Sequence, residues 1–165
     1  MGRDKQGSAA TEARAASATM QLKKGGRLSI PAGVLKMVGW QDPPEVLKLT
    51  AELVTPGYVR LYKRDAVETS LEAKRTKLAK KAAAGDSEAL RKLKFFVDRY
   101  RPLSLQKENR VWLTESVIIF LGGKPKDLPY FFIQAADTKE EIEIMSIAMR
   151  DELMEELGGD EDVTL

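Results

Sequence analysis

The stretch Lys23-Lys24-Gly25-Gly26-Arg27-Leu28-Ser29-Ile30-Pro31-Ala32 decides the fold, because its pattern returns 83 positions further along the chain. Arg27-Leu28-Ser29-Ile30 falls on Arg110-Val111-Trp112-Leu113, and each segment has a basic residue followed by the alternating apolar positions of a half-buried strand. The same shift aligns Gly39 with Gly122. The chain therefore contains an internal repeat, which is the signature of two related structural units.

The sequence pattern of each unit predicts the same order of elements: strand, tight turn, strand, short helix, strand, loop and strand. In the first unit Gly25 and Gly26 can adopt the positive φ that hairpin turns require, Pro31 begins the short helix, and Gly39 ends it. In the second unit Thr114 is the expected N-cap of the corresponding helix, which Gly122-Gly123 should end.

A unit of about 45 residues is too small to bury a self-sufficient core. Two such units can interleave their hairpins and close one barrel in which the sheet edges are paired. The predicted fold class is therefore α+β, with a pseudo-dimeric swapped-hairpin β-barrel built from two β-β-α-β-β repeats, a helical hairpin between them and a C-terminal helix.

The sequence predicts five consecutive parts: a disordered arm at 1–19, a first repeat at 20–63, a helical hairpin at 64–101, a second repeat at 102–146, and a helix with an acidic tail at 147–165. Asp65 and Glu68 have the spacing of a capping box at the start of the first hairpin helix. The second hairpin helix is expected to begin at Asp86 or Ser87.

Composition narrows the possible functions. The chain contains no cysteine and no histidine, so the commonest zinc ligands, the Cys-His pair and the Ser-His-Asp triad are missing. We therefore expect no enzyme activity, no metal, no cofactor and no small-molecule substrate. No apolar run approaches the ~20 residues of a membrane-spanning helix, and a secretory signal is not expected. These features predict a cytoplasmic protein without a membrane partner.

Charge is distributed unevenly along the chain. Residues 1–140 carry 26 basic and 16 acidic side chains, whereas residues 141–165 carry one arginine and nine acids. A basic body with an acidic tail is consistent with a polyanionic partner. An ordinary solvated surface is the alternative interpretation of the same charges.

The segment from Lys24 to Ala32 resembles the signature of the SpoVT-AbrB superfamily, and two copies joined by a helical hairpin resemble its MraZ family. The resemblance implies a sequence-specific transcriptional repressor that is nucleoid-associated, assembles into a homo-oligomeric ring and binds double-stranded DNA through the arginine turn of each repeat. The family motif has an aspartate four residues before each arginine. Here those positions are Lys23 and Gln106.

The predicted DNA-binding residues are those of the two turns: Lys23, Lys24, Gly26, Arg27, Lys107 and Arg110. Basic residues in a turn can clamp phosphates, and an arginine can also read guanine edges. Glu115 is expected to weaken phosphate binding by the second repeat, so the first repeat is expected to dominate. A solvated hairpin is the alternative for both turns.

Other features leave alternatives open. Twelve basic residues of the hairpin helices extend the DNA surface or form a solvated face: Lys63, Arg64, Lys74, Arg75, Lys77, Lys80, Lys81, Arg91, Lys92, Lys94, Arg99 and Arg101. Trp40, Trp112, Phe131 and Phe132 are expected in the core or at a subunit interface. Apolar residues of the terminal helix, with Phe132 and Trp112, predict a homo-oligomer larger than a dimer.

Two further functions compete with DNA-binding regulation. The first is an antitoxin-like module that binds a protein partner through its helices or tail. The second is an oligomeric scaffold that has lost DNA binding.

Overall fold

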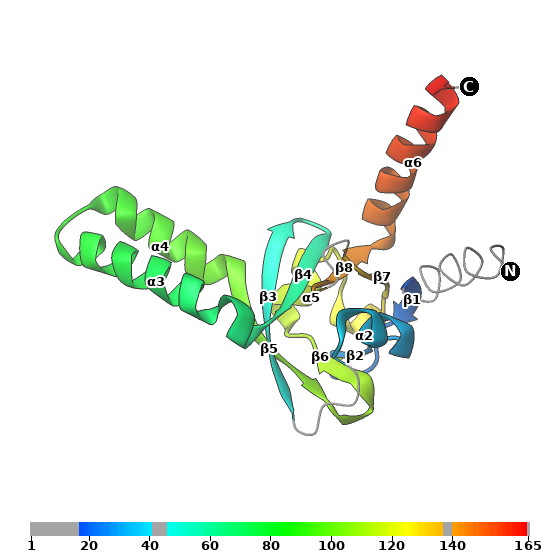
Figure 1. Cartoon of the computed structure of the whole chain (residues 1–165), viewed down its shortest axis with the longest axis horizontal. Helices are drawn as coiled ribbons and strands as arrows, with labels where there is room; N and C mark the ends of the chain where they lie inside the picture. Colours follow the sequence, from blue (N-terminus) through cyan, green and yellow to red (C-terminus); the bar gives the residue numbers. More distant parts are fainter. Residues whose placement is uncertain (1–16, 41–45, 137–139, 165) are drawn as a thin grey trace, which may run out of the picture.

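Short strands with alternating apolar residues pair into one antiparallel sheet, which curls into a nearly closed barrel (Figure 1). The computed structural model describes residues 17–40, 46–136 and 140–164. The strands are β1 (Ser17–Gln21), β2 (Arg27–Ser29), β3 (Leu47–Thr55), β4 (Tyr58–Lys63), β5 (Tyr100–Gln106), β6 (Arg110–Trp112), β7 (Tyr130–Ala135) and β8 (Ile142–Ser146). The α-helices of these described ranges are α2 (Ala32–Val38), α3 (Arg64–Ala83), α4 (Ser87–Arg99), α5 (Glu115–Phe120) and α6 (Ile147–Thr164). The predicted α+β class is confirmed.

The strand order is β1-β7-β8-β4-β3-β5-β6-β2, so strands from the two halves of the chain are hydrogen-bonded to one another. β1 pairs with β7, β3 with β5, β4 with β8, and β2 with β6. A single bridge between Lys23 and Arg27 brings the two ends of this order together at a tight turn. The first and second halves therefore share one sheet.

One hydrophobic core fills the barrel. Leu28 of β2 and Val111 of β6 are register partners, and both are fully buried. α2 buries Val34, Leu35 and Val38, and α5 buries Val117 and Ile118. Each fully buried side chain of this size stabilises the fold by about 1.5–3 kcal/mol. Since both halves contribute to the core, neither buries its apolar face alone.

The four predicted core or interface aromatics have different environments. Trp40 and Phe131 are buried, which confirms a core position for these two. Phe132 is half-buried, with the Arg150 guanidinium carbon 5.5 Å from its ring centroid. Trp112 is 48% exposed, so the core alternative is wrong for Trp112 and the subunit-interface alternative stays a prediction. Trp112 is the third residue of β6 and faces outward, because its neighbours Val111 and Leu113 face the core.

The helical hairpin extends away from the barrel (Figure 1). Asp86 caps α4, since its carboxylate accepts hydrogen bonds from the backbone N–H groups of Glu88 (3.0 Å) and Ala89 (3.1 Å). This confirms the predicted start of the second helix. The capping box at Asp65 is wrong, because β4 continues directly into α3 and Lys63 occupies the N-cap position without a side-chain hydrogen bond.

The ends of the elements differ slightly from expectation. β1 begins at Ser17, three residues inside the segment expected to lack structure, and residues 1–16 of that segment lie outside the described residues. β5 begins at Tyr100, two residues before the expected start of the second repeat. Pro31 is the N-cap of α2, and the helix itself begins at Ala32. Within the described ranges, no helix is long and apolar enough to cross a membrane.

Candidate nucleic-acid interface

The turn between β1 and β2 holds the first group of predicted DNA-binding residues. The Lys23 N–H donates to the Arg27 carbonyl (2.8 Å), and the Gly26 N–H donates to the Lys23 carbonyl (3.2 Å). Gly25 and Gly26 both have a φ of +84°, as predicted, a conformation in which L side chains are strained. The tight turn leaves the side chains of Lys23 and Lys24 exposed.

Gly26 is the only predicted DNA-binding residue among the six that is buried. Its carbonyl accepts a hydrogen bond from the Leu113 N–H (2.7 Å), and a Cβ at this position would overlap the Leu113 carbonyl oxygen. Gly26 therefore fixes the first turn against the second half of the chain, and it contributes backbone geometry and not a DNA-facing side chain.

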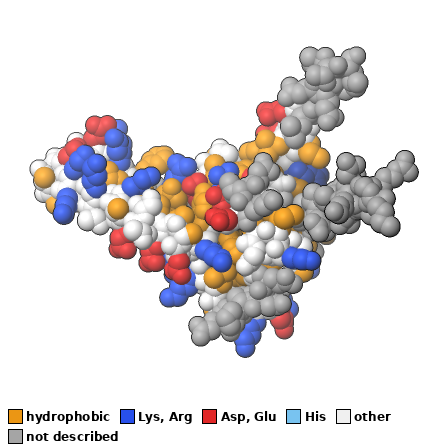
Figure 2. All heavy atoms as spheres, in the orientation of Figure 1, with side chains coloured by type: hydrophobic (Ala, Val, Ile, Leu, Met, Phe, Trp, Pro, Cys, Tyr) orange, Lys and Arg blue, Asp and Glu red, His pale blue; other side chains and the backbone are white. Residues whose placement is uncertain are grey.

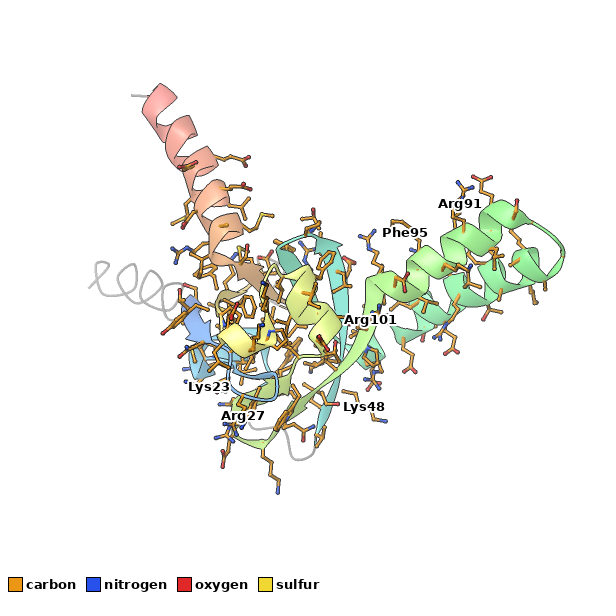
Figure 3. All side chains as sticks on the ribbon, turned by 180° about the vertical axis from the view of Figure 1, so that it is seen from behind. Lys23, Arg27, Lys48, Arg91, Phe95 and Arg101 are labelled. Carbon is orange, nitrogen blue, oxygen red and sulfur yellow. The ribbon has the colours of Figure 1, made fainter. Side chains whose placement is uncertain are left out.

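β2 and β6 form a two-stranded ribbon that carries both arginines. Arg27 is the register partner of Trp112, and Ser29 is the register partner of Arg110. The central pair, Leu28 with Val111, points into the core, so the four flanking side chains lie on the outer face of the ribbon. The structure therefore brings Arg27 and Arg110 onto one surface from positions 83 residues apart. Figure 3 shows Lys23 and Arg27 together at this end of the barrel.

The turn between β5 and β6 holds the second group. Lys107 to Asn109 form a single 3-10 turn, in which Glu108 and Asn109 have left-handed φ values of 63° and 61°. The Arg110 guanidinium lies 2.8 Å from the Glu108 carboxylate, and both side chains are partly exposed. The Glu108 carboxylate therefore offsets the positive charge of Arg110 in the second turn. Within the described part of the chain, neither Arg27 nor Lys23 has an ion pair shorter than 4 Å.

Trp112 belongs to this surface, and sequence reasoning missed it. The Arg27 guanidinium carbon lies 6.0 Å from the Trp112 ring centroid, within the range of a cation–π interaction. A Cβ at Gly25 would lie 3.5 Å from the Trp112 ring. The indole therefore supports the first turn from across the ribbon. The available signal was its alternation with Val111 and Leu113, which predicts opposite faces of the strand.

Lys124 and Lys126 are further basic residues that sequence reasoning missed. They line a groove of about 470 Å³ beside Gly25 and Gly26. Glu115 lines the same groove and contributes the opposite charge. Lys48 is exposed, and Figure 3 shows it at the same end of the barrel as Lys23 and Arg27. The sequence signal for the first two was Lys124-Pro125-Lys126 directly after the Gly122-Gly123 helix end.

Several basic residues of the hairpin have structural partners. Arg64 donates to the carbonyls of Leu49 and Leu103 (3.2 Å each), which ties α3 to β3 and β5. Arg99 pairs with Glu52 at 3.6 Å, and Lys92 with Glu88 at 3.9 Å. Figure 2 shows the remaining basic side chains spread along the hairpin. These contacts favour a structural interpretation for part of the basic face of the hairpin.

No group of three or more acidic side chains that could hold a metal ion occurs in the described ranges. Comparison of the chain with models of known protein families finds no match, and comparison with curated proteins finds none.

Proposed function

We propose that the chain is a sequence-specific DNA-binding transcriptional regulator of the MraZ type, which binds double-stranded DNA with the outer face of the β2–β6 ribbon. The observation that carries the proposal is the register of this ribbon, which puts Arg27 and Arg110 on one exposed face beside the basic first turn. The major groove of B-DNA admits a two-stranded ribbon, and arginine is the commonest side chain that reads guanine.

The interleaved strand order supports a swapped-hairpin barrel of the SpoVT-AbrB kind. β2 begins at Arg27 and β6 at Arg110, and β3 begins at Leu47 and β7 at Tyr130, so both pairs recur at the same 83-residue spacing as the sequence repeat. Each half pairs its strands with the other half. In this interpretation one chain acts as a pseudo-dimer that presents two related turns to DNA.

The two turns differ in charge, and this difference supports the first turn as the one that makes the main contacts with DNA. Lys23 and Lys24 are exposed next to Arg27, and beside the turn glycines the two positive charges of Lys124 and Lys126 outnumber the one negative charge of Glu115. In the second turn Arg110 is paired with Glu108. Regulation by such a protein requires only occupancy of a promoter, with no chemical step and no cofactor, in the cytoplasm and on the nucleoid.

The test is selection of genomic DNA fragments by the full chain, followed by fluorescence anisotropy on the selected site over a range of salt concentrations. The logarithm of the DNA-binding constant falls linearly with the logarithm of the salt concentration, and we call the gradient of this line the salt slope. Each lysine whose phosphate contact is removed lowers the magnitude of the salt slope by about one. We expect this for the double variant Lys23→Gln/Lys24→Gln. The matched control is Lys77→Gln/Lys80→Gln on the exposed face of α3, for which we expect a smaller change.

Two results would overturn this proposal. Undetectable DNA affinity at low salt would favour the oligomeric scaffold. Equal loss of the salt slope in both double variants would show that the turn holds no special role.

A further inference from the structure

The base of the helical hairpin contains a pocket that is separate from the proposed DNA surface. The pocket has a volume of about 340 Å³ and lies between α3, α4, β3 and β5. Figure 3 shows Arg101, one of its lining residues, where the hairpin meets the barrel. Pockets that bind small molecules have volumes of about 300–1,000 Å³, so this pocket is large enough for one small ligand.

Thr50 is a buried polar residue in the wall of this pocket. Its neighbours in β3, Leu49 and Ala51, are buried in the core, so Thr50 faces the opposite side of the sheet, where α3 and α4 pack on β3. Only 7% of Thr50 is exposed, and among the described residues its hydroxyl has no hydrogen-bond partner. Buried polar groups are nearly always hydrogen-bonded, so this hydroxyl is suited to bind a polar atom of a ligand.

Arg64 contributes a positive charge beside this hydroxyl. Its Nη2 donates to the carbonyls of Leu49 and Leu103 (3.2 Å each), which holds the guanidinium next to Thr50, the residue after Leu49. Both carbonyls are neutral, and within the described ranges no carboxylate lies within 4 Å of Arg64, so the charge is not compensated. The Nε and Nη1 groups also have no hydrogen-bond partner there, and both are donors.

The other charges of the pocket wall leave an excess of positive charge. Arg101 is already paired with Asp98 at 3.6 Å, so it does not count as available. Arg75, on the same side of α3 as Arg64, is exposed and has no ion pair in the described part of the chain. Glu68 is the one acidic residue among the described residues of the wall. Two available arginines against one carboxylate favour an anionic ligand.

Apolar side chains complete the wall. Phe96 and Tyr100 line the pocket with ring centroids 5.0 Å apart and ring planes inclined by 48°, and Leu71 lines it from α3. Such a wall packs well against a flat ring, whereas an inorganic anion would leave it in contact with water. We propose that the pocket binds a small organic anion with one anionic group and one flat ring.

In this arrangement the anionic group binds Arg64 and the Thr50 hydroxyl, and the ring packs against Phe96 and Leu71. A nucleoside monophosphate and an aromatic carboxylate share this chemistry. The bound molecule contacts both helices of the hairpin and two strands of the barrel, so it acts as an effector that stabilises the hairpin against the barrel, and not as a substrate. Binding at this site goes beyond the proposed function and does not require DNA.

The experiment measures binding to the full chain by isothermal titration calorimetry with four probes. Adenosine monophosphate and salicylate each combine an anionic group with a flat ring, and they distinguish a phosphate from a carboxylate ligand. Inorganic phosphate has the charge without the ring, and adenosine has the ring without the charge. We expect at least one of the two ring-bearing anions to bind about tenfold more tightly than phosphate and adenosine, because only these anions use both parts of the pocket.

Nuclear magnetic resonance locates the bound probe. The backbone amide signals of Thr50 and Arg101 should shift when the probe is added, and those of Lys23 and Arg27 should not. Arg27→Ala should bind the probe as the wild type does. This variant separates the pocket from the proposed DNA surface, so failure of the proposed DNA binding leaves the result unaffected.

Substitutions test the individual groups, and circular dichroism checks that the variants remain folded. Thr50→Val removes the hydroxyl and keeps the shape of the side chain, and it should weaken binding about two- to tenfold. Arg64→Gln should weaken binding at least about tenfold, but it also removes the contacts that tie α3 to the barrel. Arg75→Gln tests the charge without disturbing those contacts, and it should also weaken binding. The matched control is Arg91→Gln, at an exposed position of α4 outside the pocket, which should bind as the wild type does.

Four results would overturn the proposal. The first is no saturable binding of either ring-bearing anion up to about 1 mM. The second is equal affinity for phosphate or for adenosine, and the third is a set of amide shifts confined to the proposed DNA surface. The fourth is wild-type affinity in both Thr50→Val and Arg75→Gln.

Discussion

Arg27 and Trp112 are register partners across β2 and β6, and the guanidinium carbon of Arg27 lies 6.0 Å from the centroid of the indole ring. The arginine comes from the first half of the chain and the tryptophan from the second. An arginine over an aromatic face loses fewer conformations when it binds a ligand. The second half therefore orients the arginine of the first half.

We predict that Arg27→Ala weakens binding to a selected DNA site by about 1–3 kcal/mol per engaged turn and relaxes base preference. Arg110→Ala should have a smaller effect, because Glu108 already holds that guanidinium. Fluorescence anisotropy at two salt concentrations measures both. A larger loss for Arg110→Ala would contradict the assignment of the first turn as principal reader.

Glu108→Gln should strengthen DNA binding. The substitution removes the carboxylate that lies 2.8 Å from the Arg110 guanidinium and leaves a side chain of the same length. We expect the magnitude of the salt slope to rise by about one, because one more cation becomes available to phosphate. The same measurement on Glu108→Gln/Arg110→Ala is the control, and a slope that rises there as well would show that Arg110 is not responsible.

Trp112 provides an optical test of the same surface. The chain has two tryptophans, and Trp40 is only 3% exposed. In the Trp40→Phe variant the remaining fluorescence comes from Trp112, and we expect DNA to quench or shift it. Trp112→Phe leaves the buried Trp40 as the emitter, and its signal should not respond. If the Trp40→Phe variant binds DNA and the fluorescence of Trp112 does not change, the DNA binds to another surface of the protein.

Gly25 and Gly26 should differ in their response to alanine. Both have positive φ, so either substitution costs about 1–2 kcal/mol in backbone strain. At Gly26 the new methyl group also overlaps the Leu113 carbonyl oxygen, which is backbone and cannot rotate away. We expect Gly26→Ala to lower the free energy of unfolding by at least about 3 kcal/mol. Urea denaturation measures both, and equal losses would contradict the close approach.

Glu143 should make stability depend on pH. Burial raises the pKa of this carboxyl above its ordinary value of 4.5. The folded state then binds the proton more readily than the unfolded state, so this contribution to stability is full below pH 4.5 and is lost as the pH rises through the raised pKa.

Glu143→Gln should therefore lose less stability than the wild type as the pH rises through this window. Urea denaturation at a series of pH values measures the difference. Glu140→Gln, which removes an exposed charge nearby, controls for net charge. Parallel pH profiles for the wild type and Glu143→Gln would refute this prediction.

Sequence patterns predicted the features that depend on local geometry. Gly25, Gly26 and Gly39 all adopt the positive φ for which glycine is favoured, and Asp86 caps the helix that it precedes. These successes rest on interactions within a few residues of each other, where the sequence alone carries the information.

Features that depend on distant partners were harder to predict. The contact of Trp112 with Arg27 depends on the pairing of β6 with β2, and the placement of Lys124 and Lys126 beside the first turn depends on how the segment after α5 packs near that turn. The pairing of Arg110 with Glu108 requires a left-handed conformation at a residue other than glycine, which propensities disfavour. The expected capping box failed at Asp65 because α3 begins at Arg64, directly after β4, so Lys63 is the N-cap and Asp65 already lies inside the first helical turn.

The interleaved strand order also determines when the protein can fold during synthesis. Thr19 of β1 pairs with Phe132 of β7, so this pairing cannot form until residue 132 has been made. β3 can pair with β4 soon after both are made, because they are adjacent in the chain. The other edge of β3 pairs with β5, which is made only after the whole helical hairpin. The nascent chain therefore leaves the ribosome with an unpaired first strand and exposed apolar residues, and the barrel closes late. The helical hairpin, whose contacts are local, can form while the second half is still being translated.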